Sequence, residues 1–398
     1  MRVLLFSWEY PPIIEGGLGR HVRKLSEQLA AEGVEVHVLT RGAGQLAAEE
    51  IRHNVHVHRV VQPRFPKQLD QFVLWVANMN RDLAAAGREL HERFDFQLIH
   101  SHDWLVADAA EEVSVAGSLP WIVTVHATEF GRHQGWVQKQ PQAHIHARER
   151  RMVRHANHVI TCSDYMAGHV QRVFDIPAKR ISTIPNGIDR GELCCAPAEE
   201  LRDLRARYAQ PDQRLVLMVG RLVFEKGFHL ALDALAPIVR RDGNVRFVIA
   251  GTGSAEAELK RQAAALGISS YGAFLGWTGD DLLHSLYRVA DLCVVPSIYE
   301  PFGLVALEAM ASGCLCLVAD TGGLREVVPA GGIAGLRFRS SDSLALRDLL
   351  EKVLTDDPMR ERLVLEAREH VLKFDWPEAA RRTLGEYRRV AARPRTLS

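Results

Sequence analysis

The sequence predicts an α/β protein with two doubly wound, Rossmann-like domains. Apolar runs typical of buried strands alternate along the chain with amphipathic helical patterns. The two halves also repeat one order of elements: a strand, a glycine-containing loop, a helix and a second strand. The 398 residues, 47% of them hydrophobic, suffice for two cores at roughly 150 residues per domain.

The first half begins with a predicted strand over residues 3–8 and a loop that carries Gly16 and Gly17. A predicted helix follows over residues 18–32, and the next strand covers residues 34–40. The paired glycines let the backbone approach a ligand closely, although a plain turn has the same signature.

The second half repeats this order with a strand over residues 215–220, a helix after Gly227 and a strand over residues 245–250. Further strands are predicted around residues 271–277 and over residues 291–296. A helix that starts where a parallel strand ends suits an anion, so we expect both halves to face one cleft.

The domain boundary is predicted between residues 187 and 211, where Asn-Gly and Cys-Cys-Ala-Pro interrupt the regular pattern. We assign residues 1–190 to the first domain and residues 191–374 to the second. Phe-Asp-Trp-Pro at residues 374–377 ends one helix and begins another. This last helix, within residues 375–398, is expected to cross back to the first domain.

The composition limits the classes of molecule that the protein is expected to bind. Lys plus Arg and Asp plus Glu both number 49, so no general affinity for nucleic acid is expected. The first apolar run is too short for a signal peptide and no uncharged stretch reaches 18 residues, which predicts a cytoplasmic protein. Arg20, Arg23 and Lys24 are interpreted as a solvated helix face, with membrane contact as the less favoured alternative.

The cysteines and histidines do not form a convincing metal set. No two of the six cysteines have the spacing of a zinc or redox motif, so they are predicted to be reduced and mostly structural. Histidine pairs two residues apart share one face if they lie on strands, but further ligands are not evident. The histidine groups are His53, His56 and His58, then His100 and His102, and then His144 and His146. We therefore predict no metal.

Two carboxylates and a helix start converge in the segment PSIYEPFGLVALEAMASG. Glu300 lies in the loop after the strand that ends at Pro296, free amides are expected near Gly303 and Leu304, and Glu308 lies one turn further into a helical pattern that begins at Val305. Unpaired amides at a helix N-terminus suit a phosphate, and a carboxylate can accept hydrogen bonds from ribose hydroxyls. A capped helix after a buried strand is the alternative.

Arg221 and Lys226 flank the loop VGRLVFEKG, which leaves a strand and enters a helix. Guanidinium and ammonium groups in this position can offset the charge that grows on a departing nucleoside diphosphate without a metal. The second glycine loop, at residues 251–256, lacks the third glycine and the distant acidic residue of a dinucleotide fingerprint. We therefore do not expect nicotinamide chemistry.

Motifs along nearly the whole chain resemble those of the retaining family 4 glycosyltransferases, closest to the glycogen and starch synthase-like branch. They are EGGLGRH, HSHDWL, TVHATEFGRH, ITCSDYM, IPNGID, VGRLVFEKG, IAGTGS, EPFGLVALEAMASG and TGGLREVV. The resemblance implies the GT-B fold, a nucleotide-sugar donor and no metal or other cofactor. It makes the first domain acceptor-binding and the second domain nucleotide-sugar-binding.

The resemblance also implies roles for individual residues. Arg221 and Lys226 would bind the diphosphate, Glu308 the ribose and Glu300 the donor sugar, while His126 would lie beside the anomeric carbon. Catalytic roles fall to His126, Glu300, Arg221 and Lys226, and acceptor contacts to Glu9, Asp103 and His126. The donor-binding set is Gly16, Gly17, Arg221, Lys226, Gly276, Trp277, Glu300, Phe302, Gly303, Leu304 and Glu308.

Two departures from the branch leave the acceptor open: Glu15 replaces the usual lysine before the glycine pair, and the first domain lacks long insertions. The leading hypothesis is transfer of glucose from ADP-glucose or UDP-glucose to an α-glucan, small sugar or sugar phosphate, with retention of configuration. The alternative is a transferase of the same fold that acts on a lipid-linked or cell-envelope acceptor. An oxidoreductase or a catalytically silent sugar-binding protein is the third hypothesis.

Overall fold

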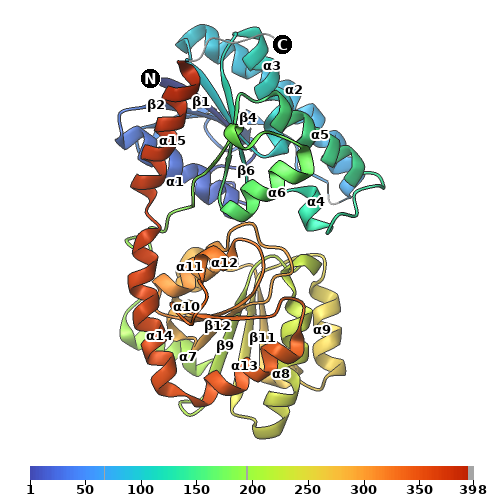
Figure 1. Ribbon diagram of the computed structural model, residues 1–398, viewed down its shortest axis with the longest axis vertical. Helices are drawn as coiled ribbons and strands as arrows, with labels where there is room; N and C mark the ends of the chain where they lie inside the picture. Colours follow the sequence, from blue (N-terminus) through green and yellow to red (C-terminus); the bar gives the residue numbers. More distant parts are fainter. Residues whose placement is uncertain (67, 194–195, 393–398) are drawn as a thin grey trace. The chain divides into compact units, whose positions relative to one another are not determined.

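A computed structural model describes residues 1–66, 68–193 and 196–392, and the chain divides into two compact units. The first unit comprises Met1–Gly187 together with the segment from Asp375 onward, and the second is Ile188–Phe374. Each unit has a predominantly parallel sheet covered by helices (Figure 1). The predicted α/β class with two Rossmann-like units is therefore confirmed.

The sheet of the first unit has eight strands in the order β3-β4-β2-β1-β5-β6-β7-β8. Neighbouring strands run parallel except for the antiparallel pair β3–β4 at one edge. The strands are β1 (Arg2–Ser7), β2 (Glu35–Gly42), β3 (Glu49–Arg52), β4 (Val55–Val61), β5 (Leu98–His102), β6 (Trp121–Val125), β7 (His158–Thr161) and β8 (Ile181–Thr183).

Helices cover this sheet, and one of them returns from the far end of the chain. They are α1 (Gly17–Ala31), α2 (Leu69–Phe94), α3 (Ala107–Ala116), α4 (Glu129–Arg132), α5 (Gln142–His155), α6 (Asp164–Phe174) and α15 (Trp376–Ala391). Figure 1 shows α15 in red beside α1 in blue, and the two helices are in contact. Trp376 and Tyr387 of α15 are buried in one core with Val22 and Leu25 of α1. The final helix is therefore part of the first unit's core.

The second unit has a six-stranded parallel sheet in the order β11-β10-β9-β12-β13-β14. Its strands are β9 (Arg214–Val219), β10 (Val245–Ala250), β11 (Gly272–Gly276), β12 (Leu292–Val295), β13 (Leu315–Ala319) and β14 (Leu336–Phe338). Its helices are α7 (Ala198–Ala206), α8 (Phe228–Asp242), α9 (Glu256–Ala265), α10 (Asp280–Val289), α11 (Leu304–Ala311), α12 (Leu324–Val327), α13 (Ser343–Thr355) and α14 (Asp357–His370).

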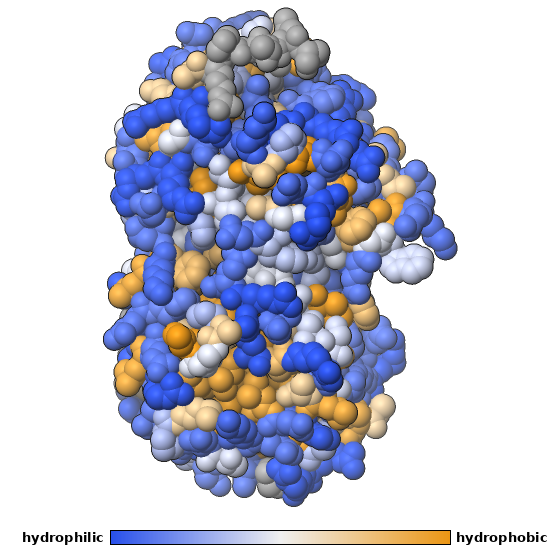
Figure 2. All heavy atoms as spheres, viewed as in Figure 1, coloured by the Kyte–Doolittle hydropathy of each residue, from blue (hydrophilic) through white to orange (hydrophobic). Residues whose placement is uncertain are grey.

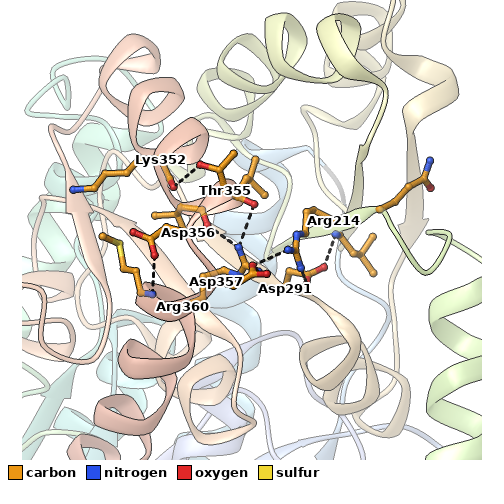
Figure 3. A network of polar contacts seen from close by, with 12 residues as sticks. Arg214, Asp291, Lys352, Thr355, Asp356, Asp357 and Arg360 are labelled. Carbon is orange, nitrogen blue, oxygen red and sulfur yellow. Dashed lines mark hydrogen bonds and ion pairs between the residues drawn. The ribbon is translucent and has the colours of Figure 1, made fainter.

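An ion-pair network joins strand starts of this sheet to α14 (Figure 3). Arg214 at the start of β9 contacts Asp291 at 3.4 Å and Asp357 at 2.7 Å. Asp291 precedes β12, pairs with Arg205 of α7 at 2.9 Å and accepts the Leu215 amide at 2.8 Å. The network thus ties both helices to the edge of the sheet where the parallel strands begin.

The visible face of each unit carries many hydrophilic side chains with hydrophobic ones among them (Figure 2). Among the described residues, no helix is both long and apolar enough to span a bilayer. Four cysteines, namely Cys162, Cys293, Cys314 and Cys316, are buried free thiols. This confirms their structural interpretation, whereas Cys194 and Cys195 lie outside the described residues.

The strands predicted at residues 3–8, 34–40, 215–220, 245–250, 271–277 and 291–296 are all present within two residues at either end. The premise that the closely spaced histidines lie on strands was wrong for His144 and His146. Both lie on helix α5, where a spacing of two residues does not place side chains on one face. His56 and His58 on β4 do share a face, as do His100 and His102 on β5.

Gly187 allows α15 to join the first unit, and a Gly187→Ala variant should loosen that helix. A Cβ at this position would lie 2.4 Å from the backbone nitrogen of Trp376, so the backbone must shift. We expect faster amide hydrogen exchange over residues 376–391. Gly385→Ala is the matched control, because a Cβ there meets nothing within 4 Å and alanine favours the helix by about 1 kcal/mol. Equal exchange in the two variants would contradict this role of Gly187.

Candidate functional site

In the second unit, the loops that follow the adjacent strands β9 and β12 are joined by hydrogen bonds. The carbonyl of Glu225 accepts the amides of Ile298 at 2.8 Å and Tyr299 at 3.2 Å. Gly227 has φ +68°, and a Cβ there would lie 2.0 Å from the carbonyl oxygen of Pro296. Only glycine permits so close an approach, which explains why this loop ends in glycine.

These hydrogen bonds between the two loops bring Lys226 and Glu300 together as a partly buried ion pair. Lys226 Nζ donates to Glu300 Oε2 at 2.7 Å, and the hydroxyl of Ser297 donates to the same oxygen at 3.1 Å. The sequence predicted both charged residues but not their pairing, and it gave no signal for Ser297. In this arrangement the lysine charge is already compensated, so an anionic ligand would compete with Glu300 for it.

Arg221 and Trp277 have the exposed side chains of the predicted donor set, in which Gly17 is exposed as well. Arg221 lies 3.8 Å from Glu225, with about half of its side chain exposed. Trp277 follows β11 and is 76% exposed, and Gly276 before it has φ +70° while its carbonyl accepts the amide of Gly251 at 2.7 Å. Both side chains can therefore move toward a ligand without disturbing the core.

Glu308 lies one turn inside α11, as predicted. It is buried, and the hydroxyl of Tyr287 donates to its Oε2 at 3.1 Å. Gly303 caps the helix with φ +117°, and a Cβ there would lie 2.7 Å from Leu324. Phe302 is buried and its ring packs against Phe374, so its side chain serves packing and only its backbone can serve a ligand.

In the first unit, the Glu9 carboxyl group accepts hydrogen bonds from the loop that carries Gly16 and Gly17. The side chain is buried, and its Oε2 accepts the amide of Gly16 at 3.1 Å and also the amide of Glu15. Burial raises the pKa of Glu9 to about 7. Glu15, which replaces the expected lysine, forms an ion pair with Arg41. Glu9 is thus engaged with backbone amides and not pointed at solvent.

Asp103 and His126 follow neighbouring strands β5 and β6 and contact each other. The Asp103 carboxylate accepts the backbone amide of His126 at 2.7 Å. Asp103 has φ +58°, a conformation that non-glycine residues rarely adopt and that often marks functional sites. Burial raises the pKa of Asp103 to about 6 and lowers that of His126 to about 3, so the imidazole is neutral at pH 7.

Two further histidines surround His126, and the sequence did not predict this grouping. His102 Nδ1 lies 3.1 Å from His126 Nε2, and the ring centroid of His21 in α1 is 4.6 Å from that of His126. One ligand atom from each of these three residues lies within 4.8 Å of the others, which makes them able to hold a metal ion. Glu35, His37 and His56 form a second such group at the opposite edge of the sheet.

The predicted basic face of α1 is more buried than its pattern suggested. Lys24 is buried and lies 3.7 Å from Glu27, while Arg20 and Arg23 are half-buried. Helix α15, from a distant part of the sequence, also packs against α1, a contact that the amphipathic pattern of α1 does not reveal. Interpretation of these cations as a fully solvated face is therefore wrong for Lys24.

Models of known families match both units. Residues 15–192 match the model "Glycosyltransferase Family 4", and residues 202–370 match "Glycosyl transferases group 1". An uncharacterised glycosyltransferase of Methanocaldococcus jannaschii is 33% identical over 98% of both chains. A glycogen synthase of Mycobacterium tuberculosis is 35% identical, with 97% of this chain and 94% of the relative covered.

Solved structures agree on the fold. Sucrose-phosphate synthase from Thermosynechococcus elongatus superposes with a TM-score of 0.82 at 26% identity, covering 98% of this chain and 99% of the other. Together with the family matches over both units, this similarity carries the assignment. The chain belongs to glycosyltransferase family 4 and has the GT-B fold.

Proposed function

We propose that the protein transfers glucose from ADP-glucose or UDP-glucose to an α-glucan, a small sugar or a sugar phosphate, with retention of configuration. The observation that carries this proposal is the Lys226–Glu300 pair, which lies at the carboxyl ends of β9 and β12 just before α11. A cation beside a helix N-terminus suits a diphosphate, and the neighbouring carboxylate suits sugar hydroxyls.

In the proposed donor complex, the diphosphate replaces Glu300 as the ion-pair partner of Lys226. Arg221, which is half exposed, swings toward the same phosphates, while the backbone amides of Gly303 and Leu304 donate from the start of α11. Glu300 is then available to accept from sugar hydroxyls. Glu308 is already oriented by Tyr287 and binds the ribose. Gly276 and Trp277 meet the base.

The proposed reaction needs no protein nucleophile. The bond between the anomeric carbon and the diphosphate oxygen breaks, and the acceptor oxygen forms a bond to that carbon on the same face. The acceptor's hydroxyl proton passes to the leaving phosphate oxygen, so charge and atoms balance. Lys226 and Arg221 stabilise the charge that develops on the diphosphate, which takes the place of a metal. Neutral His126 can contact the sugar without repelling positive charge at the anomeric carbon.

A carbohydrate acceptor is favoured by two similarities. One relative is named a glycogen synthase and one structural neighbour a sucrose-phosphate synthase. The lipid-linked alternative relied on the basic face of α1, of which Lys24 is buried against Glu27. Purified protein should therefore be assayed with ADP-, UDP- and GDP-sugars against maltooligosaccharides, glucose 1-phosphate and lipid extracts. Transfer of glucose to lipid alone would overturn the proposal, and product anomer analysis tests retention.

Lys226→Ala should lower kcat for transfer by about 10²–10³-fold, as expected when one positioned donor to a developing anion is lost. The rate is measured with saturating donor and acceptor. Lys260→Ala is the matched control, because Lys260 forms an exposed pair with Glu256 in the same unit. Unchanged turnover in Lys226→Ala with a folded protein would contradict the phosphate role.

Gly16→Ala should reduce transfer without loss of stability. Gly16 has an extended backbone with φ −175°, and a Cβ there would meet nothing within 4 Å, so the unfolding free energy should change by less than about 0.5 kcal/mol. A donor or sugar that approaches the loop would meet the new methyl group and bind more weakly. Gly44→Ala, with equal space, is the control. If the KM for donor is the same in both variants, the loop does not contact the ligand.

Glu9→Gln should stabilise the protein increasingly as pH rises. Folding raises the pKa of Glu9 from 4.5 to about 7. The stability that the protonated carboxyl contributes is therefore fully present below the pKa of the unfolded chain, and it is lost as pH rises through about 7. Glutamine does not ionise and keeps an oxygen for the loop amides. The gain in unfolding free energy should grow by about 2 kcal/mol between about pH 5 and about pH 8.

Urea unfolding at each pH measures this gain. Glu112→Gln serves as the control, since Glu112 is an exposed partner of Arg88. A gain for Glu9→Gln that does not vary with pH would show that burial does not hold the carboxyl protonated.

A further inference from the structure

We propose that His21, His102 and His126 form a three-histidine site for a divalent transition metal such as Zn²⁺. Their side chains come from α1, the end of β5 and the residue after β6. One nitrogen of each lies within 4.8 Å of the others. Three neutral imidazoles with one open position are a known donor set for zinc.

Hydrogen bonding leaves one nitrogen unsatisfied on each of two rings, those of His21 and His102. Within residues 1–66, 68–193 and 196–392, His21 Nε2 and His102 Nε2 are buried and have no hydrogen-bond partner. An unpaired buried polar atom is unfavourable, because it has lost its hydrogen bonds to water without gaining another partner. The neighbouring His100 differs, because its Nδ1 contacts Tyr387 at 2.6 Å and its Nε2 contacts Thr124 at 2.7 Å. His100 is therefore a structural residue, whereas the other rings retain capacity for a ligand.

Asn186 prepares His21 as a ligand. His21 Nδ1 lies 2.8 Å from Asn186 Oδ1, and an amide oxygen can only accept, so Nδ1 carries the proton. The lone pair of His21 is then on Nε2, the atom without a partner. Such an outer hydrogen bond fixes the tautomer and orientation of metal-binding histidines.

The His102–His126 contact also suits a metal. Two nitrogens bound to zinc at about 2.0–2.1 Å in a tetrahedron lie about 3.3 Å apart. His102 Nδ1 and His126 Nε2 are 3.1 Å apart, and a change of tautomer that moves the proton between them to the other nitrogen of its ring makes both lone pairs available to the ion.

The second histidine group is a poorer candidate, because its ligand atoms are engaged with residues outside the group. His37 contacts His58 through Nδ1 at 2.9 Å and Glu35 through Nε2 at 3.2 Å. Glu35 in turn accepts from Arg2 at 2.8 Å. Metal binding there would break these contacts, and this group therefore serves as the internal comparison.

Titration of the purified protein with Co²⁺ tests the site, because tetrahedral Co²⁺ absorbs visible light and reports its ligands. We expect one equivalent per chain, displaced by Zn²⁺, without a thiolate charge-transfer band. His21→Ala should abolish the signal, and Asn186→Ala should weaken affinity about 10–100-fold. His56→Ala, which removes a ligand of the second group, should leave it unchanged. Circular dichroism checks that each variant is folded.

Three outcomes would overturn the proposal: no bound Co²⁺, a thiolate band, or a signal that survives His21→Ala and disappears in His56→Ala. If the site binds a metal ion, Zn²⁺ should inhibit glycosyl transfer and a chelator should restore the activity, because His126 would bind the metal and no longer contact the sugar. This last expectation rests on the proposed function. Metal binding is measured without substrate, so failure of the site and failure of the transferase assignment remain distinguishable.

Discussion

Parallel pairing of strands places all their carboxyl ends at one edge of a sheet, and this constraint assembles both groups of candidate residues. In the second unit it brings the loops after β9 and β12 close enough for the Glu225 carbonyl to bind two amides of the other loop. In the first unit it brings Asp103 and His126 into contact. Residues distant in sequence thus meet because their strands are neighbours.

The Lys226–Glu300 pair shows how charge is handled before a ligand binds. A lysine left alone in a partly buried loop would lose solvation, and the carboxylate compensates for that loss. A diphosphate offers the lysine a stronger partner, and it also frees the carboxylate for hydroxyl groups. Selectivity for phosphorylated donors can therefore arise from exchange of one ion pair for another.

Sequence reasoning succeeded where the signal is local. Strand and helix order follows from periodicity, and the Gly227 and Gly303 turns follow from backbone requirements. Contacts between segments far apart in the sequence could not be predicted in this way. Examples are the packing of α15 on α1 and the grouping of His21 in α1 with His102 at the end of β5. The contact of Glu9 with the loop amides was also not predicted, because a carboxylate that accepts such amides has no sequence pattern.

The return of α15 makes the first unit discontinuous along the chain, with the whole second unit inserted between its parts. During synthesis from the N-terminus, β1 to β8 emerge long before Trp376 and Tyr387, which complete their core. The surface that α1 will share with α15 therefore stays uncovered while the second unit folds. Chaperone demand should consequently peak in this interval, and release of the nascent chain before α15 would leave an apolar stripe prone to aggregation.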